Sequence, residues 1–262
     1  MSKPSGKKGA VYQAPAVDKA VDILEYLSLQ RDGATMKEIA DGVGRSTTEI
    51  YRVALALERR SLIFKDPQTD RFSLSMRLFE LSHQHPPSAR LIGMAQPIME
   101  DLAQSTLQSC HLSVADGERL LILASVDSPL SMHYRVKLGS SFPLTETSSG
   151  TVLVTFWRPE DQETIMGNLD PQARKAFEAR VNAVKETDRE VRASDVVDGI
   201  VNISTPIRDY TGRVRAALTI PFLKRKNMAH SEDDVIAQAV HAASQISAAL
   251  GFVRRPPDNA PM

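Results

Sequence analysis

The chain has 262 residues, a formal net charge of zero and one cysteine, Cys110. This length favours two compact domains, and the single cysteine excludes an intrachain disulfide framework and a cysteine-rich zinc site. No apolar stretch approaches the roughly 20 residues that cross a bilayer, and the basic N-terminus lacks the apolar region of a secretory signal. We therefore expect a cytoplasmic protein that does not bind membranes. Its neutral charge argues mildly against nucleic-acid binding, which usually needs a basic surface.

The N-terminal part of the chain has the pattern of a helix-turn-helix. After a basic arm at residues 1–14, which we expect to be disordered, apolar residues recur with a helical period over residues 17–27. Thr35 and Glu38 have the spacing of a capping box at the start of a second helix. Gly44 then permits a tight turn, and Ser46 is the expected N-cap of a third helix.

A β-hairpin is expected directly after these three helices. The β-prone runs 62–65 and 71–74 flank a turn-rich segment. This hairpin would form the wing of a winged helix-turn-helix domain spanning residues 15–75. A linker helix is expected over residues 76–87, and the two prolines at its end place the domain boundary there.

Helices and strands mix in the second domain, residues 88–251, so the predicted fold class is α+β. A hairpin at 110–115 and 119–126 turns at Asp116–Gly117, and a second strand pair joins through residues 209–212. A disordered tail is expected at 252–262. The remaining elements predicted here are helices 89–105, 148–156, 171–185 and 234–250 and strands 200–207 and 214–222.

The third helix carries residue types that contact phosphates and base edges. The start of a recognition helix faces the major groove, which is where these residues lie. A solvated helix face in a protein-binding domain would have a similar composition, although the wing favours DNA. The predicted DNA-binding residues are Arg45, Ser46, Thr47, Thr48, Glu49, Tyr51, Arg52 and, in the wing, Arg71.

Glu49 is discordant within this set, because an acid near phosphates lowers affinity for DNA. It could accept a hydrogen bond from a cytosine amino group. It could equally pair with Arg45 or Arg52 and hold them in place.

Several segments together resemble the IclR family of transcriptional regulators, over about residues 16–251. The opening helix, the recognition helix with Leu57, the wing and a late strand pair all match in order and spacing. The segments that carry this resemblance are residues 16–24, 46–52, 62–74, 199–209 and 211–214.

The resemblance implies a homodimer, or a dimer of dimers, that binds double-stranded operator DNA and a small effector. The C-terminal domain of such regulators is similar to GAF-type sensor domains and holds its effector between the sheet and short helices. Asn202, Pro221 and Arg192 depart from residues common in the family, which leaves the ligand open. The matching positions are Ser131, Tyr134, Phe142, Ser148, Ser149, Gly150, Arg192, Asn202, Thr219 and Pro221.

Hydroxyl groups, a helix N-terminus and one guanidinium make a receptor for a carboxylate. We therefore expect a small organic acid as effector, and aromatic, keto and sugar acids all remain candidates. Each position also has a purely structural interpretation: Ser148 and Ser149 as helix caps, Arg192 as a solvated loop residue and Tyr134 as packing.

Nothing in the sequence indicates catalysis, a cofactor or a metal. Ser149 lacks the flanking glycines of a nucleophile elbow, and Cys110 and His111 point to opposite faces of a predicted strand. His83 and His85 have the wrong spacing for a helical metal pair. The alternative to an effector-responsive regulator is a constitutive DNA-binding or assembly protein with a ligand-free sensor domain. An enzyme acting on an organic acid is a more distant third hypothesis.

Overall fold

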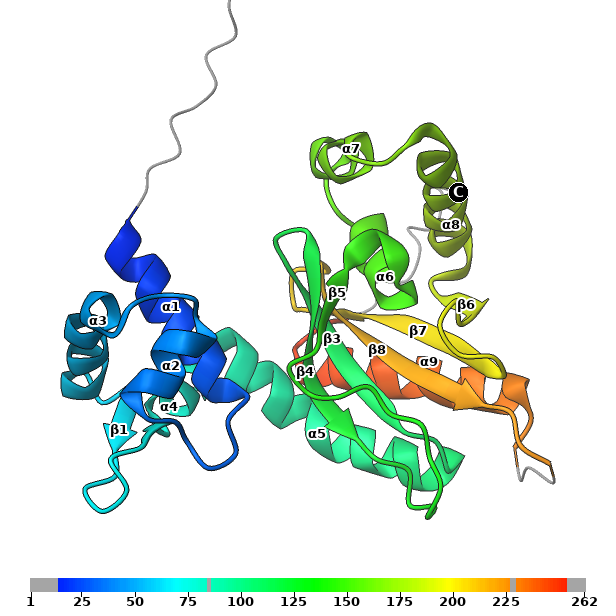
Figure 1. Ribbon diagram of the computed structural model, residues 1–262. Coiled ribbons are helices and arrows are strands. Elements are labelled where there is room, and N and C mark those ends of the chain that lie inside the picture. The colour runs from blue at the N-terminus through cyan, green and yellow to red at the C-terminus, as the bar shows by residue number, and fades with distance from the viewer. Residues whose placement is uncertain (1–13, 84–85, 227–229, 254–262) are drawn as a thin grey trace, which may run out of the picture. The chain divides into compact units, whose positions relative to one another are not determined.

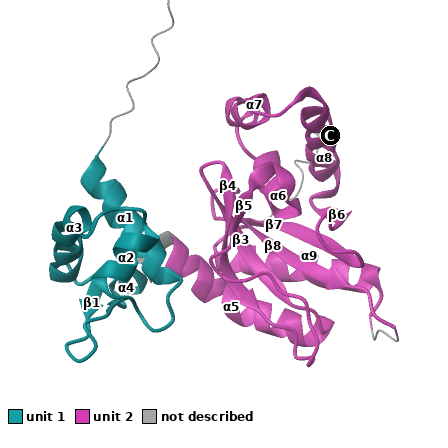
Figure 2. Cartoon of the chain, viewed as in Figure 1, with its two compact units in different colours: residues 1–85 teal, residues 86–262 magenta. Residues whose placement is uncertain are grey.

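The computed structural model describes residues 14–83, 86–226 and 230–253. The chain divides into two compact units, residues 1–85 and 86–262 (Figure 2). The mixture of helices and strands confirms the predicted α+β class and the N-terminal winged helix-turn-helix. The basic arm up to residue 13 and the tail from residue 254 lie outside the described residues.

The first unit packs three helices and a short hairpin around one apolar core. Thr35 and Ser46 cap α2 and α3, and each takes part in a complete capping box. The core joins the inner faces of the helices to the hairpin through Ile23, Ile39, Ile50 and Phe72. In chain order its elements are α1 (Pro15–Ser28), α2 (Met36–Gly42), α3 (Thr47–Arg59), β1 (Ile63–Lys65), β2 (Phe72–Leu74) and α4 (Arg77–His83).

The second unit is a six-stranded antiparallel sheet with helices on both faces. Its strand order is β5-β4-β3-β8-β7-β6, so the two predicted strand pairs meet where β3 pairs with β8. In chain order its elements are α5 (Pro86–Thr106), β3 (Cys110–Asp116), β4 (Arg119–Val126), β5 (Ser141–Pro143), a 3-10 turn (Leu144–Glu146), α6 (Ser148–Thr155), α7 (Pro159–Gly167), α8 (Pro171–Thr187), β6 (Glu190–Ala193), β7 (Ile200–Arg208), β8 (Val214–Leu223) and α9 (Glu232–Ala249).

Different helices cover the two faces of this sheet (Figure 1). Helices α5 and α9 pack on one face over a large apolar core that includes Cys110, Leu112, Ile203 and Leu218. Helix α6 packs on the other face, against five of the six strands, and α8 packs beside it. Because strand side chains alternate, residues next to those core positions point toward α6.

Most differences from the sequence prediction concern short or proline-containing elements. Helix α5 begins at Pro86, three residues before the predicted start, because proline fits the first turn of a helix. Helix α7 and the edge strands β5 and β6 were not anticipated. Within the described residues, no helix is both long and apolar enough to cross a membrane.

Candidate functional site

Helix α3 presents one polar face away from the core of the first unit. Its buried side consists of Ile50, Ala54 and Leu57, spaced with the helical period. The opposite side is exposed and carries four of the predicted DNA-binding residues together with Leu55, an exposed apolar residue that was not predicted. Its spacing of four residues from Tyr51 is the sequence signal that could have identified it. The four predicted residues on this face are Thr47, Thr48, Tyr51 and Arg52.

The carboxylate of Glu49 is bound to the start of its own helix. Glu49 Oε2 accepts hydrogen bonds from the Ser46 amide at 2.9 Å and from the Ser46 hydroxyl at 2.7 Å. These two hydrogen bonds lower the pKa of Glu49, and the one from the Ser46 amide has the larger effect. Its nearest cation is Lys19, with Nζ 3.8 Å from Oε1. The carboxylate is therefore ionised and fixed by Ser46 and Lys19, neither of which was among its predicted partners.

Two of the predicted DNA-binding arginines form ion pairs within the first unit. Arg45 Nη2 lies 2.8 Å from Asp22 Oδ2 on α1. Arg71 Nη2 lies 2.9 Å from Glu38 Oε2, and the same guanidinium donates to the carbonyls of Asp32 and Gly33. Arg52 differs from both, because its side chain makes no hydrogen bond or ion pair within the described part of the chain. Its guanidinium is thus available to an external anion.

In the second unit, the start of α6 is buried against the sheet. Thr147 caps the helix by accepting a hydrogen bond from the Gly150 amide at 3.0 Å, and all eight residues of α6 are buried. A Cβ atom on Gly150 would lie 1.9 Å from the carbonyl oxygen of Leu144, so only glycine fits here. This close approach fixes the helix N-terminus, whose partial positive charge favours anions.

A row of polar side chains crosses the sheet beneath α6. The strand register places Ser125, His111, Thr219, Ser204 and Glu190 opposite one another on β4, β3, β8, β7 and β6. Thr219 Oγ1 lies 2.7 Å from Ser149 Oγ on α6 and 2.8 Å from Ser204 Oγ. The row therefore connects the helix start to the sheet. Of its members only Thr219 was predicted, although polar residues alternating with apolar ones on these strands were visible in the sequence.

Arg180 on α8 holds the segment that leads into α6. Its guanidinium donates to the carbonyls of Thr145 and Thr147 and pairs with Glu190, with Nε 2.7 Å from Oε1. Both side chains of this ion pair are largely buried. Arg180 was not predicted as a site residue, because only the fold brings α8 to this segment.

Arg192 reaches the same segment from β6. One of its terminal nitrogens pairs with Asp195, and Nη2 donates weakly to the Glu146 carbonyl at 3.4 Å. Its Nε is shielded from solvent and has no partner among the described residues. Asn202 and Pro221 continue from Arg192 across β7 and β8. The structure thus brings these three predicted residues into one cross-strand row, but Asp195 offsets the charge of Arg192.

The other predicted effector residues lie toward the opposite edge of the sheet. Phe142 is on β5, which is three strands from Thr219 in the sheet order, or about 14 Å along the sheet at the usual strand spacing. Ser131 and Tyr134 lie in the 127–140 segment that leads to β5, the first exposed and the second half-buried. A small acid held by Ser149 and Thr219 would contact these residues only at the margin of the site.

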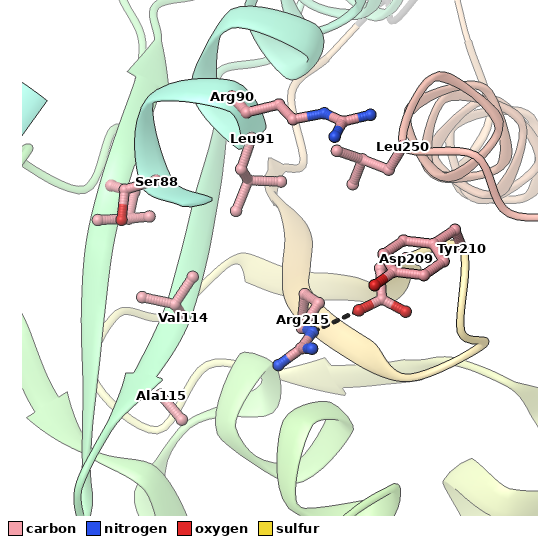
Figure 3. Close-up of a pocket in the computed structure, with 10 residues that line it drawn as sticks. Ser88, Arg90, Leu91, Val114, Ala115, Asp209, Tyr210, Arg215 and Leu250 are labelled. Carbon is pink, nitrogen blue, oxygen red and sulfur yellow. Dashed lines mark hydrogen bonds and ion pairs between the residues drawn. The ribbon is translucent and has the colours of Figure 1, made fainter. Parts of the chain in front are cut away.

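A separate cavity of about 550 Å³ opens on the α5–α9 side of the sheet (Figure 3). Arg90 from α5 and Arg215 from β8 line it, and Arg215 pairs with Asp209. Apolar side chains such as Leu91 and Leu250 supply the rest of its wall. None of the predicted effector residues lines this cavity.

No cluster of ligating side chains suited to a metal ion occurs in the part of the chain that the structure describes. Cys110 lies in the apolar core, as predicted, and burial raises the pKa of its thiol to about 12.

A winged helix-turn-helix joined to a sensor-like α/β domain defines a class of DNA-binding regulators, and the comparisons with known proteins give the family. Residues 16–67 match the IclR helix-turn-helix domain, and residues 84–248 match the C-terminal domain of bacterial IclR transcriptional regulators. The chain therefore belongs to the IclR family, as the sequence predicted. It is a transcriptional regulator with a DNA-binding helix-turn-helix and a C-terminal ligand-binding domain.

Relatives match nearly the full length of the chain. The HTH-type transcriptional regulator KdgR of Escherichia coli (strain K12) is 25% identical over 247 residues, which cover 90% of this chain and 93% of KdgR. An IclR homologue from Microbacterium hydrocarbonoxydans, solved in complex with 4-hydroxybenzoate, superposes with a TM-score of 0.76 at 20% identity, covering 90% of this chain and 98% of that one. The Thermotoga maritima IclR structure gives a TM-score of 0.69 at 20% identity over the same shares.

Proposed function

We propose that this regulator reads operator DNA with the exposed face of α3, and that a small organic acid bound at the start of α6 modulates its affinity. The observation that carries the proposal is that each unit has one polar surface that its own apolar core does not require. One is the α3 face with Arg52, and the other is the buried polar row at the N-terminus of α6. Coupling between such sites is typically worth about 1–3 kcal/mol. Repression and activation both fit this arrangement.

The DNA-binding part of the proposal rests on Thr47, Thr48, Tyr51 and Arg52. Their exposure and position at the start of α3 suit the major groove, whereas Arg45, Ser46, Glu49 and Arg71 would act mainly by holding the domain in shape. Arg52→Ala should weaken operator binding about 10- to 100-fold, the usual loss for a base-reading arginine.

Fluorescence anisotropy with DNA from upstream of the protein's own coding region, at about 0.15 M salt, measures this loss. Arg31→Ala is the matched control, since Arg31 is an exposed arginine that lies outside α3. Unchanged binding by the Arg52 variant would show that α3 does not read the operator as proposed.

An organic acid suits the second site because its carboxylate would meet the N-terminus of α6. The amides of Ser148 and Ser149 donate to no acceptor among the described residues, and the helix dipole favours a negative charge there. Binding of 4-hydroxybenzoate by the related Microbacterium protein is consistent with this class. Asn202 and Pro221 would line the adjacent sheet, and Ser131, Tyr134 and Phe142 the margin.

A thermal-shift screen of aromatic, keto and sugar acids tests the site, because a ligand that binds only the folded state raises the melting temperature. Arg192→Ala and Thr219→Val should reduce the shift given by any hit. Arg90→Ala is the control, since it alters the cavity on the opposite face of the sheet. If only the Arg90 variant loses the ligand-induced rise in melting temperature, the effector binds in that cavity instead. A screen without hits would favour the constitutive assembly protein.

Pairing of two chains would use the exposed apolar residues around α4. Met76 is 66% exposed and Leu81 is 45% exposed, although both side chains are large and apolar. A second copy of the chain would cover them and give the two-fold symmetry of a palindromic operator. The double variant Met76→Glu/Leu81→Glu should run as a 28.8 kDa monomer in size-exclusion chromatography with light scattering. A dimer in that variant would place the interface elsewhere.

A further inference from the structure

Three polar atoms around the start of α6 are shielded from solvent and have no hydrogen-bond partner among the residues that the structure describes. They are His111 Nδ1, Ser125 Oγ and Ser148 Oγ. The His111 residue is only 4% exposed and Ser148 only 3%. Buried polar groups in native proteins are almost always hydrogen-bonded, to protein, water or ligand. Three such atoms in one region therefore indicate a partner that is not part of the chain.

The strand register brings His111 and Ser125 together, and Ser148 begins the helix that packs on the same two strands. His111 on β3 lies directly opposite Thr219 on β8 and Ser125 on β4. Side chains opposite each other in an antiparallel sheet share a face, with Cβ atoms about 5 Å apart. Thr219 in turn contacts Ser149, the neighbour of Ser148, at 2.7 Å. His111 therefore lies within reach of a small molecule whose carboxylate is at the α6 N-terminus.

The imidazole of His111 is suited to an uncharged partner. Burial lowers its pKa to about 4, so the ring is neutral at pH 7 and offers one N–H donor and one acceptor. The other unpartnered atoms are hydroxyl oxygens, which also donate and accept. A hydroxyl or carbonyl oxygen can satisfy these groups. A second carboxylate would be buried here without a counter-charge, which is strongly unfavourable.

We propose that His111 is a specificity-determining residue that hydrogen-bonds an uncharged oxygen of the effector, which makes the effector a hydroxy or oxo acid. This inference rests on the proposed function, since it deepens the assignment of the α6 site. The carboxylate is read by the helix N-terminus, and the hydroxyl or oxo group is read by His111, Ser125 and Ser148. An acid without the second oxygen leaves these polar atoms unpaired in the complex, and the site discriminates against it.

The test is isothermal titration calorimetry of the full-length protein with two matched pairs of acids. The pairs are 4-hydroxybenzoate with benzoate, and pyruvate with propionate. In at least one pair, the oxygen-bearing acid should bind about tenfold or more tightly than its partner. His111→Leu should remove this preference by weakening only the oxygen-bearing acid, and His111→Gln, which keeps a hydrogen-bonding group, should restore most of it.

Two further variants separate recognition from folding. Ser113→Ala is the matched control, because Ser113 is a buried polar residue on the same strand and face that is already bonded to the Ala217 carbonyl. It should leave the preference unchanged. Ser148→Ala should reduce the preference without altering β3, and it replaces the leucine variant if circular dichroism shows that His111→Leu does not fold.

The outcomes distinguish this inference from the proposed function. Equal affinity within both pairs, or a preference that survives both His111→Leu and Ser148→Ala, would overturn the role of His111 and leave the organic-acid site standing. Failure of all four acids to bind would overturn the inference together with the proposed site. A preference lost in His111→Leu and kept in Ser113→Ala is the supporting result.

Discussion

The two faces of the C-terminal sheet are made by the same strands yet differ in chemistry. Toward α5 and α9, the strands contribute Cys110, Leu112, Ile203 and Leu218 to a continuous apolar core. Toward α6, the next residues along the same strands are His111, Ser113, Ser204 and Thr219. Both sets are buried, so burial alone does not reveal what a position does. The α6 face also has an apolar cluster, which includes Leu120, Ile122 and Ala217, but only this face keeps a row of buried polar groups that a ligand can use.

The largest effect should come from the apolar face. Leu218→Ala removes a fully buried side chain, and a cavity of this kind costs about 2–5 kcal/mol in the free energy of unfolding. Urea denaturation followed by circular dichroism measures it, with the exposed Met132→Ala as control. A loss below about 1 kcal/mol would mean that this face is not the main source of stability.

Next in size is the effect of Arg180→Ala on the polar face. It leaves Glu190 buried without its partner and releases the carbonyls of Thr145 and Thr147. Breaking such a pair costs about 3 kcal/mol. Lys175→Ala on the same helix is the control, since Lys175 is exposed. If Arg180→Ala unfolds at the same urea concentration as that control, the ion pair does not stabilise the start of α6.

A smaller, pH-dependent contribution comes from Asp209, in the turn between β7 and β8. Burial alone would raise its pKa, but hydrogen bonds from Thr211 and Arg215 outweigh that effect and lower the pKa from 3.8 to about 2. Because the folded-state pKa is depressed, the contribution is present above about pH 4 and is lost as the pH falls toward 2.

This lowering of the Asp209 pKa corresponds to about 2 kcal/mol in the free energy of unfolding. Unfolding free energies measured from pH 6 to pH 2 should show a steeper acid loss for the unsubstituted protein than for Asp209→Asn. Parallel curves would contradict the assignment.

The smallest effect on stability should come from Thr219→Val, one residue from Leu218. Valine keeps the shape but removes the hydroxyl between Ser149 and Ser204, which costs about 1 kcal/mol. Its effect on effector binding should nevertheless exceed that of Leu218→Ala in the folded protein. Calorimetric titration of both variants with the same acid tests this contrast directly, and the reverse order would invalidate the division between the faces.

The sequence predicted the fold well where a local signal determines structure. The capping positions Thr35 and Ser46, the hairpin turn after Asp116 and the core position of Cys110 all follow from spacing or alternation, and the structure confirms them. The short edge strands β5 and β6 lack such a signal, because their pairing depends on neighbours that are distant in the sequence.

The site was predicted less completely because side-chain partners are set by tertiary packing. Nothing local distinguishes Arg52, whose side chain has no partner among the described residues, from Arg45, which pairs with Asp22 in another helix. Asp195 beside Arg192 also reduces the charge that the sequence interpretation assigned to the effector site. Alternation on β3 could have identified His111 as a residue that faces α6. Only the folded structure shows that its Nδ1 is buried without a hydrogen-bond partner among the described residues.

Gly150 has a consequence for how ligand specificity can change in this protein. Since any side chain there would collide with the Leu144 carbonyl, random mutagenesis should recover glycine alone at this position. New specificities would have to arise at its neighbours, such as Ser148, Ser149, Asn202 and Thr219. If the proposed effector site is right, the helix start is an anchor that cannot vary within a pocket that can, and descendants of this regulator would acquire different effectors while each keeps its acid group in the same place.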